Sequence, residues 1–336
     1  MPATVALLVV ASNEGAYLAE FVHHHLAMGF APIVVVTNNC TDSTVAVTEA
    51  LTRADPRIRR HDGDWIWQKH PSKDFQMVAY RTALETIRAE LGPGDYLALL
   101  DVDEFWTPLD GTETVQAHLA ALHHPDIVVA SWFVPDADQT LFAPPLKLTL
   151  SGRLMPQVKS IWRADLEITR FNPHFAWAKG ENRTVFLAGI PLAPGTARLA
   201  EPPTRPGDAM IVHHMFRSRV EYLAFLRRGN PTEDGAFKTN RHGYDVLPRT
   251  LNRCRVEITP ALVARHEALT GFLATTGTAE ATREGQRQTL HRAIEGGKTY
   301  LALPRTERAA FKAPFRNLPL RRTIWRARKG LKTFRD

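Results

Sequence analysis

The stretch Tyr96-Leu97-Ala98-Leu99-Leu100-Asp101-Val102-Asp103-Glu104 decides the expected fold. Its first five residues are apolar and predict a buried strand, and the chain becomes acidic directly after them. A strand that is buried on both faces is typical of a parallel sheet covered by helices. Side chains at positions i and i+2 of a strand point the same way, so we expect Asp101 and Asp103 to face a common point.

The segments around this stretch alternate between strand and helix patterns. We expect strands at 5–11, 33–37, 57–61, 96–100 and 127–132, with helices ending near 28 and 53, then at 75–91 and 112–122. Beyond residue 135 the pattern is looser, with strands expected at 158–163 and 210–213, helices at 219–228 and 260–275, and a loop at 191–207. The alternation predicts an α/β fold, Rossmann-like, with a mostly parallel sheet flanked by helices.

Three polar clusters follow the ends of expected strands, at 12–14, 38–42 and 101–104. Ligands of open α/β sheets bind beyond the carboxyl ends of the strands, so we expect these clusters to meet at one edge. The cluster at 38–42 also has a simpler interpretation, as a turn in which Thr41 or Asp42 caps the next helix.

Composition and charge exclude several classes of protein. With 44% hydrophobic and 23% charged residues, the chain is too apolar to be intrinsically disordered. No apolar run approaches the ~20 residues of a membrane-spanning helix. The net charge is +7, yet residues 305–336 hold 11 basic and 2 acidic residues, which leaves the rest of the chain near neutral. A basic tail on a neutral body argues against a nucleic-acid-binding protein.

The two cysteines, Cys40 and Cys254, are too few for a disulfide framework, and the sequence begins without the pattern of a signal peptide. We therefore expect a cytoplasmic protein, held at the inner face of the plasma membrane if the tail binds lipid.

The acidic pair carries the clearest chemical signal. Two adjacent carboxylates repel each other unless a cation or strong donors lie between them. Oxygen ligands of this kind suit Mg²⁺ or Mn²⁺. His213 follows the apolar strand at 210–213 and is a candidate third ligand at the same edge. A solvated turn remains the alternative for Asp101 and Asp103, and a surface charge remains the alternative for Arg81 and Lys159.

Several segments together resemble glycosyltransferases of the GT-A fold, above all those similar to families 2 and 92. Asp101-Val102-Asp103-Glu104-Phe105 and the segment from His213 to Ser218 are the most specific. The resemblance covers residues 4–230. Its other parts are Asn13-Glu14, Glu20-Phe21, His25-Leu26, Gly29, the run from Val34 to Thr44, Gln76, Tyr80, the run from Lys159 to Arg163, His174, Glu221 and Arg228-Gly229. Thr37 and Cys40 depart from the family-2 pattern, which has Asp and Ser there.

The resemblance implies transfer of a hexosyl group from a nucleotide-sugar donor to a glycan, a lipid-linked or another hydroxyl acceptor, as in polysaccharide biosynthesis. It implies a divalent metal, Mn²⁺ or Mg²⁺, held by Asp101, Asp103 and His213. It also implies that the donor is contacted by a set of residues at the strand ends: Asn13, Glu14, Asn38, Asp42, Arg81, Asp101 and Lys159.

Transfer with inversion also needs a base for the proton of the acceptor hydroxyl. The candidates are Glu104, His174 and Glu181, with Asp136 and Asp138 as further carboxylates. Two other functions remain open at this point. One is a metal-dependent nucleotidyltransferase, which would release pyrophosphate. The other is a non-catalytic, transferase-like module that binds at the membrane.

We expect a GT-A-like domain at 1–255 and a helical extension with a basic amphipathic tail at 256–336. In the tail, Leu320, Ile324, Ala327, Leu331 and Phe334 recur at helical spacing, with Trp325 beside them and basic residues elsewhere. This pattern predicts either an in-plane contact with an anionic membrane or a helix packed on the domain.

Overall fold

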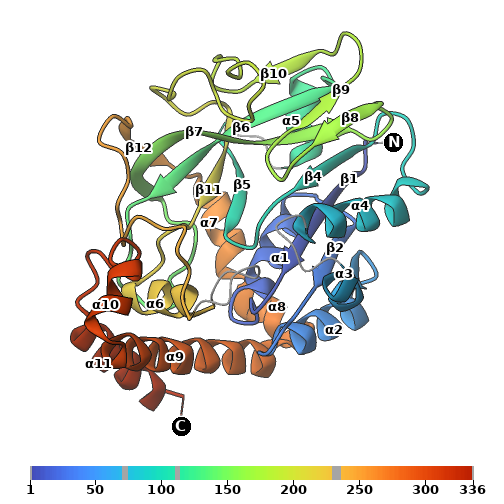
Figure 1. The fold of residues 1–336 in the computed structure, drawn as a ribbon. Coiled ribbons are helices and arrows are strands. Elements are labelled where there is room, and N and C mark those ends of the chain that lie inside the picture. Colours follow the sequence, from blue (N-terminus) through green and yellow to red (C-terminus); the bar gives the residue numbers. More distant parts are fainter. Residues whose placement is uncertain (1, 70–74, 110–113, 229–235, 335–336) are drawn as a thin grey trace.

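The computed structural model describes residues 2–69, 75–109, 114–228 and 236–334 (Figure 1). The first half contains β1 (Val5–Ala11), α1 (Leu18–Ala27), β2 (Ile33–Thr37), α2 (Thr44–Ala54), β3 (Ile58–Asp62), α3 (Asp64–Lys69), α4 (Phe75–Arg88), β4 (Tyr96–Leu99), β5 (Glu104–Pro108), α5 (Val115–Ala121), β6 (Ile127–Pro135) and β7 (Thr149–Arg163). The second half contains β8 (Ile168–Phe171), β9 (Ala176–Ala178), β10 (Thr184–Phe186), β11 (Ala209–His213), α6 (Arg219–Arg227), β12 (Arg253–Glu257), α7 (Pro260–Glu267), α8 (Leu269–Thr275), α9 (Ala279–Ala302), α10 (Arg305–Arg308), a 3₁₀ turn (Ala309–Phe311) and α11 (Leu320–Lys332).

A mixed sheet forms the centre of the molecule, in the order β3-β2-β1-β4-β7-β6-β11-β5. The strands β3, β2, β1 and β4 are parallel neighbours, and β11 is parallel to β6. The strands β7, β5 and β12 run against their neighbours. The carboxyl ends of β1, β2, β4 and β11 therefore lie at the same edge of the sheet.

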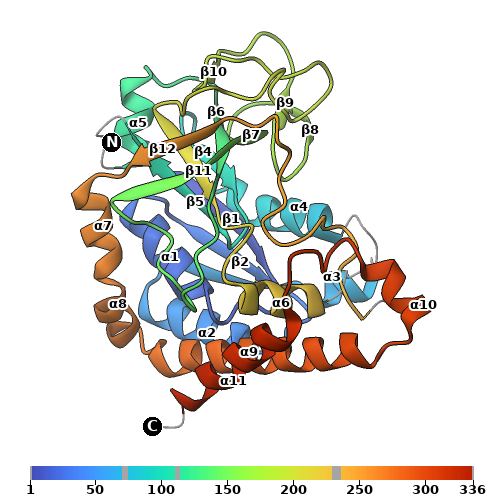
Figure 2. The ribbon, with the colours of Figure 1, turned by 90° about the vertical axis from the view of Figure 1, so that its left-hand side faces the viewer.

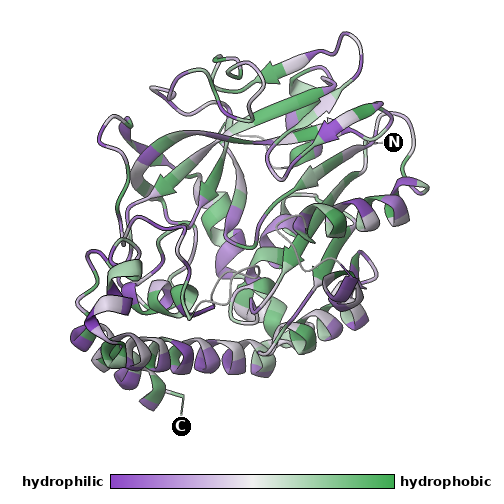
Figure 3. Cartoon of the chain, in the orientation of Figure 1, coloured by the Kyte–Doolittle hydropathy of each residue, from purple (hydrophilic) through white to green (hydrophobic). Residues whose placement is uncertain are grey.

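Both faces of the sheet are covered at its centre, which explains why the central strands β1, β2 and β4 are almost entirely apolar. Alternate residues of β1 enter different cores: Val5, Leu7 and Val9 pack into one, and Ala6 and Leu8 into the other. Helix α1 packs on the first face, and α4 packs on the second (Figures 1 and 2). Figure 3 shows the central strands as mostly hydrophobic, and the long helix α9 as mostly polar.

The expected α/β architecture is confirmed, and the sheet differs from expectation in its reversed strands. Strand β7 is longer than the expected 158–163, and β5 and β12 were not expected. The helix expected at 260–275 is divided into α7 and α8, which meet at Ala268. The expected helix at 112–122 begins partly outside the described residues; Thr114 caps it by accepting a hydrogen bond from the N–H of Ala117.

The C-terminal elements pack on the body of the fold. Helix α9 lies against α6 and α2, and α11 lies against α9 (Figure 2). Leu290, Ile324 and Ala327 belong to the same core as β1. The domain boundary expected after residue 255 falls inside β12, which pairs with β7. No helix within the described ranges is both long and apolar enough to span a bilayer.

Candidate functional site

The turn between β4 and β5 carries the acidic cluster. The N–H of Glu104 donates to the carbonyl of Asp101 (2.9 Å), and the N–H of Asp101 donates to the carboxylate of Glu104 (2.8 Å). Because Asp101 and Asp103 lie in this turn and not in a strand, the alternation of strand side chains does not set their directions. The strand argument for a shared direction is thus wrong, and the two carboxylates have different partners.

Asp101 is held by Lys159, which lies in the middle of β7. The Lys159 ammonium is 3.2 Å from Asp101 and 2.7 Å from Glu104, and its side chain is 2% exposed. The second oxygen of Asp101 accepts a hydrogen bond from the amide of Gln76 in α4 (3.0 Å). Burial lowers the pKa of Lys159, but the two carboxylates outweigh it and hold that pKa above its usual value. Lys159 is therefore the cation between these two acidic groups.

Glu104 is fully buried beside this ammonium. Burial is the largest effect on its carboxyl group and, with the charge of Asp101, raises its pKa to about 7 despite Lys159. Its second oxygen, Oε1, has no hydrogen-bond partner among the described residues. This combination suits a proton-holding group, but the side chain is 0% exposed, so contact with a substrate would require rearrangement.

Asp103 is paired with His213, the last residue of β11. The imidazole Nε2 lies 3.5 Å from Asp103 Oδ2, and the ring packs on Trp132 with centroids 4.1 Å apart. Antiparallel pairing of β11 with β5 sets His213 opposite Glu104, next to the acidic turn. Burial raises the pKa of Asp103, but His213 outweighs it and holds that pKa well below its usual value. Burial lowers the pKa of His213, and Asp103 reverses this to a net increase.

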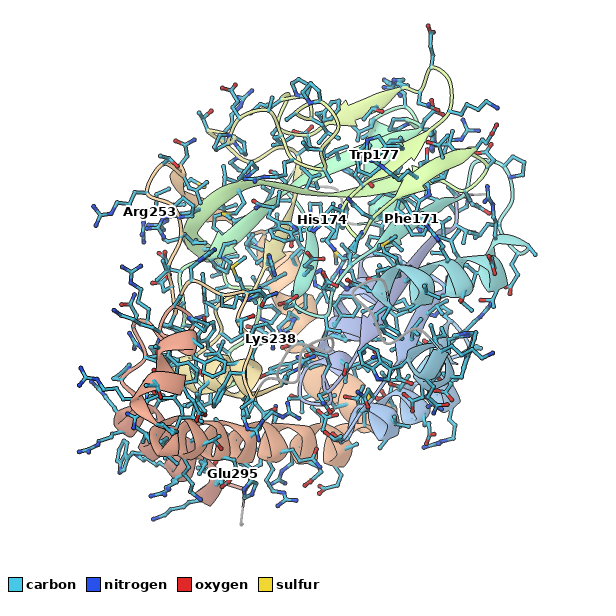
Figure 4. All side chains as sticks on the ribbon, viewed as in Figure 1. Phe171, His174, Trp177, Lys238, Arg253 and Glu295 are labelled. Atoms are coloured by element: carbon cyan, nitrogen blue, oxygen red, sulfur yellow. The ribbon has the colours of Figure 1, made fainter. Side chains whose placement is uncertain are left out.

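His174 lies in the turn between β8 and β9 (Figure 4) and also packs on Trp132, with ring centroids 5.2 Å apart. Its Nδ1 lies 3.0 Å from the carbonyl of Val158, and a carbonyl only accepts, so Nδ1 carries the proton. Burial, followed by the charge of Lys159, lowers the pKa of His174 to about 4. At neutral pH it is therefore a neutral imidazole whose Nε2 is a proton acceptor.

Hydrogen bonds connect the loops that follow β1 and β2. The backbone of Asn13 has a positive φ of 58°, and its side-chain oxygen accepts a hydrogen bond from the N–H of Thr41 (2.7 Å). Asp42 accepts hydrogen bonds from the N–H groups of Thr44 (2.9 Å) and Gly15 (3.3 Å). Asp42 therefore holds the loop just before α2. The N-cap of that helix is Ser43, which makes no side-chain cap hydrogen bond, so the simpler interpretation of Thr41 or Asp42 as the helix cap is not confirmed. Asn38 is 4% exposed, and its Oδ1 has no partner among the described residues.

A narrow cavity of about 50 Å³ opens beside Asp103 and is rich in cations. Its lining includes Glu14, Arg217, Arg228, Arg241 and Arg292. Arg228 is paired with Glu14 (2.5 Å), and the guanidinium of Arg217 stacks on the ring of Tyr17 at 3.5 Å.

Arg241 also lines this cavity, and its Nη1 donates a hydrogen bond to the carbonyl of Asn240. Its Nε has no hydrogen-bond partner among the described residues. Lys238 is next to it; both cations lie near the ring of Phe225, at 4.8 Å for Lys238 and 4.9 Å for Arg241. Burial, then the charges of Arg228 and Arg241, lowers the pKa of Lys238 to about 8. Figure 4 labels Lys238 on the α6 side of the site. We name Arg228, Lys238 and Arg241 the cationic cluster.

A larger cavity of about 390 Å³ adjoins the first. The two share His214, Arg217 and Glu221 in their linings. Asp136 and Asp138 line the larger cavity, where Asp136 pairs with Arg253 and Asp138 with Lys147.

The remaining predicted residues lie away from the acidic turn. Arg81 is exposed on α4 and stacks on Phe171 of β8 at 5.9 Å. Glu181 is exposed in the loop between β9 and β10, and nothing in the described part of the chain links it to the site by a hydrogen bond or ion pair. Gly229, part of the family resemblance, lies outside the described residues.

A metal ion fits the Asp103–His213 pair better than the predicted set of three. Nowhere in the described ranges do three His, Cys, Asp or Glu side chains gather into a metal-binding group. Asp101 is occupied by Lys159 and Gln76, as described above. By contrast, Asp103 Oδ2 and His213 Nε2 are 3.5 Å apart, close to the roughly 3 Å between adjacent ligands when metal–ligand distances are about 2.1 Å. The other ring nitrogen of His213, Nδ1, is buried and has no hydrogen-bond partner among the described residues.

Sequence reasoning missed most of the cations. Arg217 and Arg228 lie within segments of the family resemblance but were assigned no role. Lys238, Arg241 and Arg292 follow no motif. Arg292 of α9 and Arg241, in the segment between α6 and β12, line the cavity, and Lys238 lies beside Arg241 at the ring of Phe225. Gln76 is one of the residues that carry the family resemblance. Trp132 could be placed only as the last residue of an expected apolar strand.

Comparison with known proteins gives a partial match. A stretch of 105 residues is 29% identical to a glycosyltransferase family 92 protein of Ricinus communis. The match covers 31% of this chain and 17% of that protein, so it spans about a sixth of the relative's length. The crystal structure of HddC from Yersinia pseudotuberculosis matches 54% of this chain and 88% of its own at 7% identity and a TM-score of 0.30, which is too low to support an argument. No family model matches the chain.

Proposed function

We propose that this chain is a glycosyltransferase of the GT-A type that moves a sugar, of the hexosyl class, from a nucleotide-sugar donor to a hydroxyl acceptor. One observation carries the proposal: Asp103, which is paired with His213 at the strand-end edge, lines a cavity whose cations outnumber its acids. This arrangement suits a ligand that brings both a metal and phosphate charge. The partial likeness to a family 92 glycosyltransferase supports the same reaction class.

Asp103 and His213 would hold a divalent ion, Mn²⁺ or Mg²⁺, with the remaining positions left for water and phosphate oxygens. Such an ion would offset the negative charge that grows on the diphosphate as the glycosyl bond breaks. Lys159 keeps Asp101 in a fixed position beside this pair. The cationic cluster lies close enough to Asp103 to affect its electrostatics, and it supports binding of the same diphosphate.

His174 is the proposed base, because it is the candidate whose protonation state best suits the role. Its protonated Nδ1 faces the carbonyl of Val158, which leaves Nε2 to accept a proton from an acceptor hydroxyl. Glu104 is buried against Lys159, and Glu181 is exposed on a distant loop, so neither is as well placed. Asp136 and Asp138 line the larger cavity, but each is paired with a cation. The larger cavity, which shares a wall with the donor cavity, is the proposed acceptor site, for a glycan or the head of a lipid-linked acceptor.

The test is a panel of nucleotide sugars incubated with the full chain and Mn²⁺ or Mg²⁺. We expect release of a nucleoside diphosphate with at least one donor, and loss of this release when the metal is chelated. Release of pyrophosphate would instead favour nucleotidyl transfer. Absence of both turnover and binding with every donor would contradict the proposal and favour a non-catalytic module.

A further inference from the structure

Helix α11 has one face packed on the fold. Ile324 and Ala327 are buried in the core, and the position of Gly330 is so close to α9 that an added Cβ would lie 3.2 Å from Leu290. Ile324 likewise approaches Gly297 of α9, where a Cβ would lie 2.5 Å from it. The apolar stripe expected to enter a membrane is thus already used for packing.

The opposite face is aromatic at its centre and basic around it. Trp325 is 60% exposed, the most exposed large hydrophobic side chain of the described residues. Four exposed cations share its face of the helix. Two precede it by four and three residues, Arg321 and Arg322, and two follow it by three and four residues, Arg328 and Lys329. Lys329 lies 5.7 Å from the centre of the Trp325 ring. We name these five residues the basic face of α11.

The charge of this face is not neutralised by the fold. None of its four cations makes an ion pair with an acidic side chain in the part of the chain that the structure describes. Like charges one turn apart on a helix repel each other, so an external anion would stabilise the arrangement. The tail has 11 basic against 2 acidic residues in a chain whose remainder is near neutral, so this charge is concentrated in one place.

We propose that the basic face of α11 binds the surface of an anionic lipid bilayer, with Trp325 in the headgroup region. From Arg321 to Lys329 the basic face extends about 12 Å at 1.5 Å per residue, and Lys332, another exposed cation, lies three residues further along the helix. This length suits an extended surface and not a single phosphate. Anionic headgroups attract each basic residue near the surface, and Trp prefers the interface between water and lipid. Because the apolar stripe faces α9, the contact is shallow and depends on charge. This inference does not depend on the proposed activity.

The experiment compares vesicle co-sedimentation of the full chain on phosphatidylcholine alone and on an equimolar mixture with phosphatidylserine. We expect binding to the anionic vesicles only, weakening as salt screens the exposed charges. Substitution of all four cations (R321Q, R322Q, R328Q and K329Q) is expected to reduce the partition coefficient by a factor of at least about 100, from about fivefold per basic residue. Trp325→Ala is expected to weaken mainly the binding that remains at high salt.

A matched control removes the same charge elsewhere, at four exposed arginines on other elements: R198Q, R205Q, R249Q and R283Q. This variant should bind within a few-fold of the unaltered chain. Thermal unfolding of both variants should be unchanged, because the altered side chains are exposed. The inference is overturned if the chain binds neither vesicle, if both variants lose binding equally, or if the chain binds RNA or DNA but no anionic vesicle.

Discussion

The imidazole of His213 lies 3.5 Å from the carboxylate of Asp103, although β11 and the turn after β4 are far apart in the sequence. This pairing changes the expected energetics of the acidic turn. Repulsion from a neighbouring carboxylate would raise the pKa of Asp103, but this pKa is lowered because His213 outweighs burial. The turn is therefore stabilised by two separate cation contacts, Lys159 for Asp101 and His213 for Asp103.

Lys159→Met should be strongly destabilising. It leaves Glu104 buried without its cation, and removing one partner of a buried ion pair costs up to about 3–5 kcal/mol. The loss should be largest above pH 7, because the pKa of Glu104 is raised to about 7 and at lower pH the carboxyl can take up a proton. The control is Lys147→Met, which breaks an exposed pair with Asp138 and should cost at most about 1 kcal/mol. Urea unfolding of both variants measures this. Equal, small losses would show that the Lys159 contacts contribute little.

Acid should destabilise the fold through buried histidines, of which His24 is the clearest. Burial lowers its pKa from 6.5 to about 3, against the hydrogen bond between its Nε2 and the carbonyl of Trp106. Between these values the unfolded chain binds more protons, so stability falls as pH falls, by up to about 1.4 kcal/mol per pH unit for this group. His24→Gln should flatten the profile of unfolding free energy against pH below 6.5. Parallel profiles for the two proteins would contradict this assignment.

Gly285 of α9 should not tolerate a methyl group. A Cβ there would lie 2.5 Å from the backbone of Ala16 and would also overlap the backbone of Gly15, and neither can move as a side chain does. Gly285→Ala should cost about 1–3 kcal/mol and displace the loop that carries Glu14. Gly271→Ala in α8 is the control: no atom lies within 4 Å of its added Cβ, so it should gain up to about 1 kcal/mol. Thermal unfolding of the two variants measures this difference. Equal changes in stability would contradict the close packing of α9 against Gly15 and Ala16.

Arg241→Gln should weaken donor binding without loss of stability. Its Nε has no partner in the described ranges, and its neighbours in the cationic cluster are of like charge. We expect the KM for the donor to rise by about tenfold, equivalent to 1.4 kcal/mol, with a smaller change in kcat. Arg228→Gln is the contrast, because it also leaves Glu14 without its partner and should lower stability. An unchanged KM for Arg241→Gln would show that the cationic cluster does not take part in donor binding.

The sequence predicts the core strands well because their apolar runs reflect burial on both faces. It predicts a helical extension over 256–336 but does not delimit α9 within it, because the glycines of α9 weaken the helix pattern. Gly285 and Gly297 are found where α9 closely approaches Gly15 and Ile324, so a tertiary contact explains what the local pattern could not. The single helix expected at 260–275 is two helices, and no strong breaker marks their junction at Ala268.

The site was partly predictable for a related reason. Asp103 and His213 each follow an apolar strand, and parallel strand ends share an edge, so their meeting could be expected. The pairing of Lys159 with Asp101 could not, because Lys159 lies in the middle of a strand whose direction and register depend on the whole sheet. Arg292 reaches the cavity only through the packing of α9, to which no motif points.

The most direct test of the central claim compares nucleoside diphosphate release by the unaltered chain, Asp103→Asn and a control, Asp165→Asn, across the donor panel with Mn²⁺. Asp165 is paired with Arg163, away from the acidic turn. We predict that Asp103→Asn lowers kcat/KM by about 10²–10³-fold, comparable to the loss of a transition-state charge contact, whereas Asp165→Asn retains activity. Normal turnover by Asp103→Asn at low metal concentration would contradict the account.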